Sequence, residues 1–138
     1  MKVVLDTNLL ISGVFFGGVP RQILEAWRDG IVTIVYSPEI LAEYQRVGER
    51  LGERFEGVDL NPFLQLLAVQ GHLQDSPDPG SPITADPDDD KFFACAHASG
   101  VKVIVSGDTH LLSASGWEGI EVLPPARFHE RFLLAEED

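Results

Sequence analysis

The segment KVVLDTN, residues 2–8, is a short apolar run that ends in a carboxylate, Asp6. A similar run, VKVIVSGD, covers residues 101–108 and ends in Asp108. Runs of this length that are rich in valine and isoleucine predict buried strands. The two segments therefore predict two strands of one sheet, each followed by an acidic side chain.

Helical patterns lie between these strands and two further expected strands, at residues 32–36 and 120–123. Apolar spacing, N-cap residues and prolines at first helical positions predict the helices. They cover residues 8–15, 20–28, 38–47, 62–70, 86–99 and 109–113, with a short helix after Pro124-Pro125. The proline-rich stretch 74–85 predicts a loop. This alternation predicts an α/β fold with a mainly parallel central sheet and helices on both faces.

Asp6 and Asp108 are expected at the same edge of this sheet. Ligands of open parallel sheets bind beyond the carboxyl ends of the strands, which is where both residues fall in the sequence. Aspartate is also common after strands because it caps turns. Either residue alone has that structural interpretation, whereas the pair indicates a site.

Glu43 is the acidic residue at the border of the expected helix 38–47. The apolar stripe of this helix is Ile40, Leu41, Tyr44 and Val47. Glu43 lies about 90° from the centre of the stripe and Glu39 about 130° from it. Glu43 is thus the candidate site residue, although an ordinary border glutamate explains the pattern too. Gly48 and Gly52 predict a weaker helix beyond residue 47, because each costs roughly 1 kcal/mol relative to alanine.

The run DPDDDK, residues 86–91, concentrates four acids at the start of a helix. Helical phase turns Asp89 toward the apolar face of that helix, and it turns Asp88 and Asp90 away. Capping of the helix explains one or two of these acids. Four acids repel one another unless a cation is bound, and clustered carboxylates suit Mg²⁺ or Mn²⁺. Such ions activate water and stabilise phosphate transition states, so the pattern favours phosphodiester hydrolysis or phosphoryl transfer.

Four segments resemble the motifs of PIN-domain nucleases, in the right order. They are VVLDTNLLIS at 3–12, SPEILAE at 37–43, DPDDDK at 86–91 followed by Ala96, and VSGD at 105–108 followed by Leu111-Leu112. The similarity spans residues 3–123 and is greatest to the VapC-like toxins of bacterial toxin–antitoxin pairs.

The resemblance implies a three-layer α/β/α fold and a Mg²⁺- or Mn²⁺-dependent endoribonuclease acting on RNA. It implies that the acidic metal-binding and catalytic positions are Asp6, Glu43, Asp89 and Asp108. Supporting positions are Asn8, Ser106 and Asp90. It also implies a partner, the antitoxin protein, and we expect a homodimer.

The composition tests this interpretation. The net charge of −12 argues against a broad basic surface for RNA. Arg46, Arg50 and Arg54 are four residues apart and would form one basic stripe on a helix, able to contact phosphates. Pairing of these arginines with Glu49 and Glu53 on a solvated face is an equally good explanation.

The chain has 138 residues, which predicts one domain covering residues 1–138. No apolar run approaches the ~20 residues of a membrane span. No signal peptide is recognised, and the single cysteine, Cys95, suits a cytoplasmic protein.

Two other functions remain open. A PIN-like module could bind RNA or protein without catalysis, although all four acidic positions are filled. A phosphatase could use Asp6 as nucleophile, but the second aspartate it needs is replaced by Asn8. Cys95 is expected in the core, and the histidines show no ligand spacing along the chain.

Overall fold

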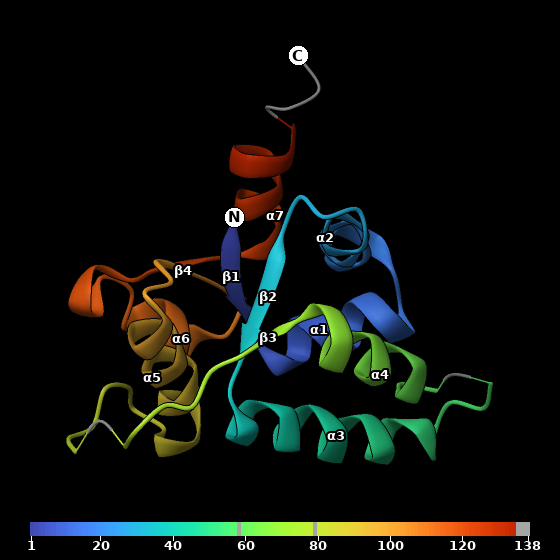
Figure 1. Ribbon diagram of the computed structural model, residues 1–138, viewed down its shortest axis with the longest axis horizontal. Coiled ribbons are helices and arrows are strands. Elements are labelled where there is room, and N and C mark those ends of the chain that lie inside the picture. The colour runs from blue at the N-terminus through green and yellow to red at the C-terminus, as the bar shows by residue number, and fades with distance from the viewer. Residues whose placement is uncertain (58, 79, 135–138) are drawn as a thin grey trace.

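The computed structural model describes residues 1–57, 59–78 and 80–134. Its centre is a parallel sheet with the strand order β3-β2-β1-β4-β5 (Figure 1). The strands are β1 Lys2–Leu5, β2 Thr33–Tyr36, β3 His72–Leu73, β4 Val103–Val105 and β5 Glu121–Leu123. The two-residue strand β3 was not predicted, because so short a pairing leaves no periodic pattern in the sequence.

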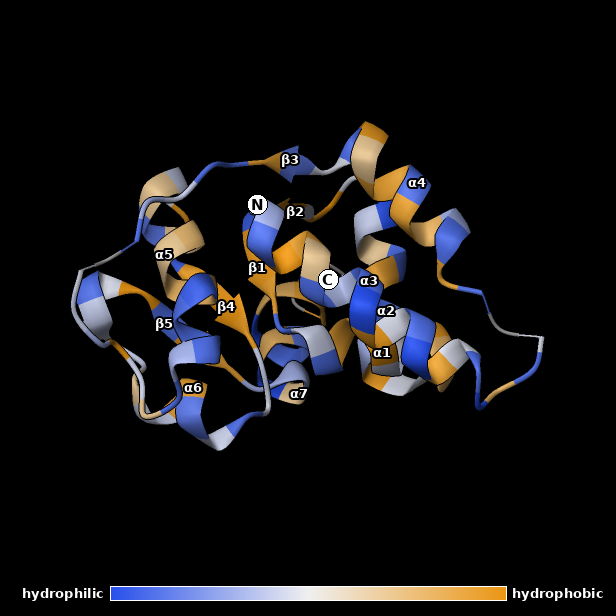
Figure 2. Cartoon of the chain, turned by 90° about the horizontal axis from the view of Figure 1, so that it is seen from below, coloured by the Kyte–Doolittle hydropathy of each residue, from blue (hydrophilic) through white to orange (hydrophobic). Residues whose placement is uncertain are grey.

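Helices cover both faces of the sheet. Figures 1 and 2 show α1–α4 on one side and α5 and α6 on the other. The bounds are α1 Thr7–Phe15, α2 Gly18–Arg28, α3 Pro38–Gly52, α4 Asn61–Gln70, α5 Asp90–Ser99 and α6 Thr109–Ser113. The helix α7, Pro125–Phe128, continues as a π-helical turn, His129–Leu133, and contacts α2. The predicted three-layer α/β/α architecture is confirmed.

The strands β1, β2 and β4 form the middle of the core. Val3, Val4 and Leu5 are fully buried, as are Ile104 and Val105, and Figure 2 shows the hydrophobic colour along β1 and β4. A strand buried on both faces needs apolar side chains at every position, which explains why these runs do not alternate. In the ranges that the structure describes, no helix is long and apolar enough to cross a membrane.

Helix α3 extends five residues beyond the predicted end at residue 47. A Cβ added to Gly48 would lie 2.1 Å from Cδ2 of Leu60, so the glycine allows the chain that follows α3 to pack closely against it. The glycine interruption is therefore a packing feature, and the prediction that the helix weakens there was wrong. Arg54 lies beyond the end of α3, so Arg46, Arg50 and Arg54 do not share one helical stripe.

The predicted helix 86–99 begins differently from the expectation. A 3₁₀ turn, Pro87–Asp89, precedes α5, and the side chain of Asp86 accepts a hydrogen bond from the backbone N–H of Asp88. Asp86 is therefore the N-cap that was predicted. Since a 3₁₀ turn advances about 120° per residue, an α-helical wheel does not give the directions of Asp88, Asp89 and Asp90.

Candidate metal centre

The candidate site lies at the carboxyl ends of β1 and β4. The chain runs from β1 to β2 in one direction and returns to β4 on the other side of β1, and such a switch point is where parallel sheets bind ligands. Val105 pairs with Leu5 in the sheet register. The next residues along the two strands, Asp6 and Ser106, therefore meet at this edge.

Asp6 is buried and held from the neighbouring strand. The hydroxyl of Ser106 donates a hydrogen bond of 2.8 Å to Oδ2 of Asp6, and the Ser106 hydroxyl oxygen accepts the backbone N–H of Asp108 at 2.9 Å. Ser106 thus fixes two acidic residues relative to each other. Burial raises the pKa of Asp6 above its ordinary value, and the charge of Asp108 adds to this rise, while the Ser106 hydrogen bond opposes it.

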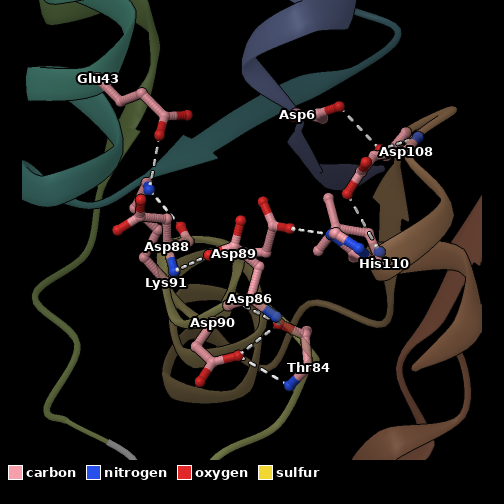
Figure 3. Close-up of polar contacts among 12 residues, drawn as sticks. Asp6, Glu43, Thr84, Asp86, Asp88, Asp89, Asp90, Lys91, Asp108 and His110 are labelled. Carbon is pink, nitrogen blue, oxygen red and sulfur yellow. Dashed lines mark hydrogen bonds and ion pairs between the residues drawn. The ribbon is translucent and has the colours of Figure 1, made fainter.

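The carboxyl of Asp89 points toward Asp6 and Asp108 from the 3₁₀ turn before α5 (Figure 3). Burial raises the pKa of Asp89 to about 6, and the next causes are the charge of Asp108 and a side-chain hydrogen bond between these two carboxyls. Asp108 also caps α6 by accepting the N–H of Leu111 at 3.4 Å. Three carboxyls from separate segments therefore come together, and their ionised forms repel one another.

Glu43 lies at the far edge of this group and is bound by other side chains. Its Oε1 is 2.7 Å from Nζ of Lys91 and 3.9 Å from the Arg46 guanidinium, and its Oε2 accepts a hydrogen bond from the Thr7 hydroxyl. The hydroxyl of Tyr44 donates to the Leu5 carbonyl at 2.6 Å, which fixes α3 against β1. Glu43 is half-buried and Glu39 exposed, as the helical phase predicted.

A further acidic residue, Asp86, and a histidine, His110, extend the group beyond the prediction. Asp86, Asp89 and His110 each offer a ligand atom within 4.8 Å of the others. His110 Nδ1 is 3.6 Å from Oδ2 of Asp89. His110 was not predicted as a site residue, because the histidines show no ligand spacing along the chain. The position of His110 two residues after Asp108 is the signal that could have identified it.

Asp90 does not point toward the cluster of Asp6, Asp89 and Asp108 (Figure 3). Its oxygens accept the backbone N–H and the hydroxyl of Thr84, both at 2.8 Å, and the N–H of Ile83 at 3.3 Å. Asp90 therefore holds the proline-rich loop against α5.

The remaining predicted residues lie at different distances from the centre. Asn8 lines a hollow of about 460 Å³ together with Asp6 and Asp108. The described contacts link Arg46 to Glu43 but do not link Arg50 or Arg54 to any of the four predicted carboxylates. Cys95 is buried in the core, and burial raises the pKa of its thiol to about 12.

The donor set suits a hard divalent cation. Carboxylate oxygens are the preferred ligands of Mg²⁺ and Mn²⁺. The raised pKa values of Asp6 and Asp89 mean that the folded chain stabilises their negative charge poorly. A bound cation would remove that penalty, so the cluster of Asp6, Asp89 and Asp108 fits such an ion.

The fold and this arrangement define a class of protein: three-layer α/β proteins with an acidic site at the carboxyl edge of a parallel sheet. The chain belongs to the PIN domain family, which it matches over residues 2–110.

One solved structure supports the same fold. It is the crystal structure of VapBC2 from Rickettsia felis bound to a DNA fragment from their promoter, and the TM-score is 0.57. The sequence identity is 14%, and the match covers 90% of this chain and 98% of that chain. Among curated protein sequences, none matches this chain.

Proposed function

We propose that this protein is a Mg²⁺- or Mn²⁺-dependent endoribonuclease and the toxin of a toxin–antitoxin pair. The observation that carries the proposal is the convergence of Asp6, Asp89 and Asp108, which come from the ends of β1 and β4 and the 3₁₀ turn before α5. PIN domain membership and the VapC-like motifs support this activity over other phosphoryl-transfer reactions.

The side chains have distinct parts in the proposed reaction. Asp6, Asp89 and Asp108 would hold the ion, and Ser106 would keep the carboxylate of Asp6 directed at it through the 2.8 Å hydrogen bond. The ion, when bound, supplies an activated water and compensates the charge that develops on the phosphate. Asn8, at the hollow beside Asp6 and Asp108, would orient the RNA backbone or the attacking water.

RNA must reach this site on a protein of net charge −12. The Arg46 side chain is 63% exposed and lies beside Glu43, so we assign it to the phosphate contact nearest the site. Arg50 and Arg54 are exposed and farther along the chain, and they would contact phosphates outside the acidic site. The bound ion would lower the local negative charge that opposes docking.

The partners follow from the same proposal. The similar solved structure contains VapBC2, and we propose that this chain has an antitoxin partner, forms a homodimer and acts on RNA in the cytoplasm. Phe16, which is 63% exposed, stacks edge-on against Phe55 at 5.4 Å and lies 6.4 Å from Phe15. An exposed aromatic group of this kind suits a protein partner better than a phosphate backbone.

The test is cleavage of an RNA oligonucleotide by the purified protein. Activity should disappear in EDTA and return with added Mn²⁺ or Mg²⁺. Asp6→Asn and Asp89→Asn should each lower kcat/KM by more than about 100-fold. Even the mutation of a residue that only hydrogen-bonds a metal ligand lowers metal affinity or activity by about 10- to 100-fold. The control is Asp75→Asn, an exposed aspartate outside the cluster, which should cleave normally.

Three outcomes would contradict parts of this proposal. Unchanged cleavage by both cluster variants would place the active site elsewhere. RNA binding without cleavage at any Mn²⁺ concentration would favour the non-catalytic module. Growth that continues when the wild-type protein is expressed alone would argue against the toxin assignment, since we expect arrest with the wild type and not with Asp6→Asn.

A further inference from the structure

Lys91 is a cation built into the acidic site. It lies in the first turn of α5, and its side chain is only 17% exposed. Its Nζ is 2.7 Å from Oε1 of Glu43, and it also donates to the carbonyl of Asp88 (Figure 3). The ammonium is thus held by two segments, α3 and the 3₁₀ turn, although the lysine side chain is long and flexible.

Both oxygens of Glu43 are engaged by protein donors. Lys91 contacts one oxygen and the Thr7 hydroxyl the other. Glu43 therefore differs from Asp89, whose partners among the described side chains are another carboxyl, Asp108, and His110. The charge of Glu43 is already compensated, whereas the charges of Asp6, Asp89 and Asp108 are not compensated by any cation that the structure describes at comparable distance.

The position of Lys91 also conflicts with a second divalent ion. In two-metal sites the ions lie about 3.5–4 Å apart, and Mg²⁺ approaches its oxygen ligands to about 2.0–2.1 Å. An ion on Oε1 of Glu43 would have to displace an ammonium that already lies in hydrogen-bond contact with that oxygen. The ammonium and the second ion compete for the same carboxylate.

We propose that Lys91 takes the place of a second divalent ion, so that the site binds a single Mg²⁺ or Mn²⁺ on Asp6, Asp89 and Asp108. Glu43 is then the partner of Lys91 and not a ligand of the ion. The inference rests on the proposed function, since it concerns the same metal site, and it changes the expectation that four carboxylates all bind the metal.

The experiment counts Mn²⁺ ions bound per folded chain, by calorimetric titration and by the electron paramagnetic resonance signal of free Mn²⁺. The wild type should bind one ion and Lys91→Met two, because removing the ammonium frees Glu43. The matched control is Lys102→Met, which removes an exposed lysine at the amino end of β4 and should leave one ion. Adding Glu43→Gln to Lys91→Met should restore one ion, which locates the second ion at Glu43 and not at Asp86 and His110.

A second variant keeps the test decisive if Lys91→Met does not fold. In the wild-type background, Glu43→Gln should weaken Mn²⁺ binding by less than about 10-fold, whereas Asp108→Asn should weaken it by more than about 100-fold. Two ions on the wild type, one ion on Lys91→Met, or equal losses for Glu43→Gln and Asp108→Asn would overturn the inference and leave the proposed ribonuclease intact. Absence of Mn²⁺ binding to every variant would contradict both.

Discussion

At the scale of single residues, Asp89 connects metal binding with stability. Its pKa in the folded chain is about 6, above the ordinary value of 3.8. A raised carboxyl pKa means that the protonated form stabilises the fold, so this contribution is present below pH 3.8 and is lost as the pH rises through about 6. The ionised group at neutral pH is a stability cost that a bound cation would remove.

Asp89→Asn should therefore raise the melting temperature in EDTA at pH 7.5, because it removes a partly buried negative charge and its repulsion by Asp108. The advantage over the wild type should shrink as the pH falls below about 6, where Asp89 itself becomes protonated. Thermal melts of both proteins between pH 4.5 and 7.5 measure the difference in melting temperature. With saturating Mn²⁺ the order should reverse, since the wild type gains the binding free energy of the ion.

The control for this series is Asp75→Asn, whose effect should not change over the same pH range. If Asp89→Asn is less stable than the wild type by the same amount at pH 5 and at pH 7.5 in EDTA, Asp89 has a structural role only.

Strand ends and motif order were enough to predict which acids lie near one another, but not what surrounds them. Asp6 and Asp108 follow adjacent parallel strands, and this placement is a property of the sequence. Lys91 and His110 reach the site through their side chains, by polar contacts with Glu43 and Asp89, which lie far along the chain. The direction of Asp90 depends on the 3₁₀ turn and on Thr84, neither of which leaves a periodic signal.

At the scale of elements, helix α3 shows how a local preference is outweighed by packing. Its two glycines lower helix propensity, yet the helix continues through both of them to Gly52. Gly48 is buried under Leu60, which is itself buried. Sequence patterns describe a residue's own preference, and the close approach of Leu60 from beyond the helix end is not visible in them. Strand β3 was not predicted for the same reason, because its pairing with β2 depends on a contact between segments that are distant along the chain.

Gly48→Ala is expected to destabilise the protein by about 1 kcal/mol. Helix propensity alone predicts a gain of about 1 kcal/mol, but overpacking typically costs about 1–3 kcal/mol, and the added Cβ would also lie 3.2 Å from Cβ and Cγ of Leu60. The packing loss should exceed the propensity gain. Urea unfolding of the wild type and the variant measures the difference.

A double-mutant cycle separates the two effects. In the background of Leu60→Ala, which removes the close contact, Gly48→Ala should become neutral or stabilising. If Gly48→Ala stabilises the protein even with Leu60 present, the close approach of these two residues does not limit the helix.

At the scale of the whole molecule, the two halves of the chain complete each other. The strands β1, β2 and β3 come from the first 73 residues and are covered on one face by α1–α4. Their other face is covered by α5, which contacts β1 and β2 and buries Phe92 and Phe93. Buried residues of both halves form one hydrophobic core, and the acidic site lies where the halves meet. That residues 1–138 form one domain stays a prediction.

Two tryptophans on opposite sides of the sheet can test that prediction. Trp27, in α2, packs at 5.1 Å from the ring of Phe63, while Trp117 packs at 5.8 Å from Phe93 of α5. One domain should unfold in a single transition. In Trp27→Phe and in Trp117→Phe, the urea midpoint from the remaining tryptophan's fluorescence should equal the midpoint from far-UV circular dichroism of the same variant. A fluorescence midpoint below the circular dichroism midpoint in either variant would mean that one side of the sheet unfolds separately. The acidic site would then join two cooperative units, and losing either would abolish metal binding.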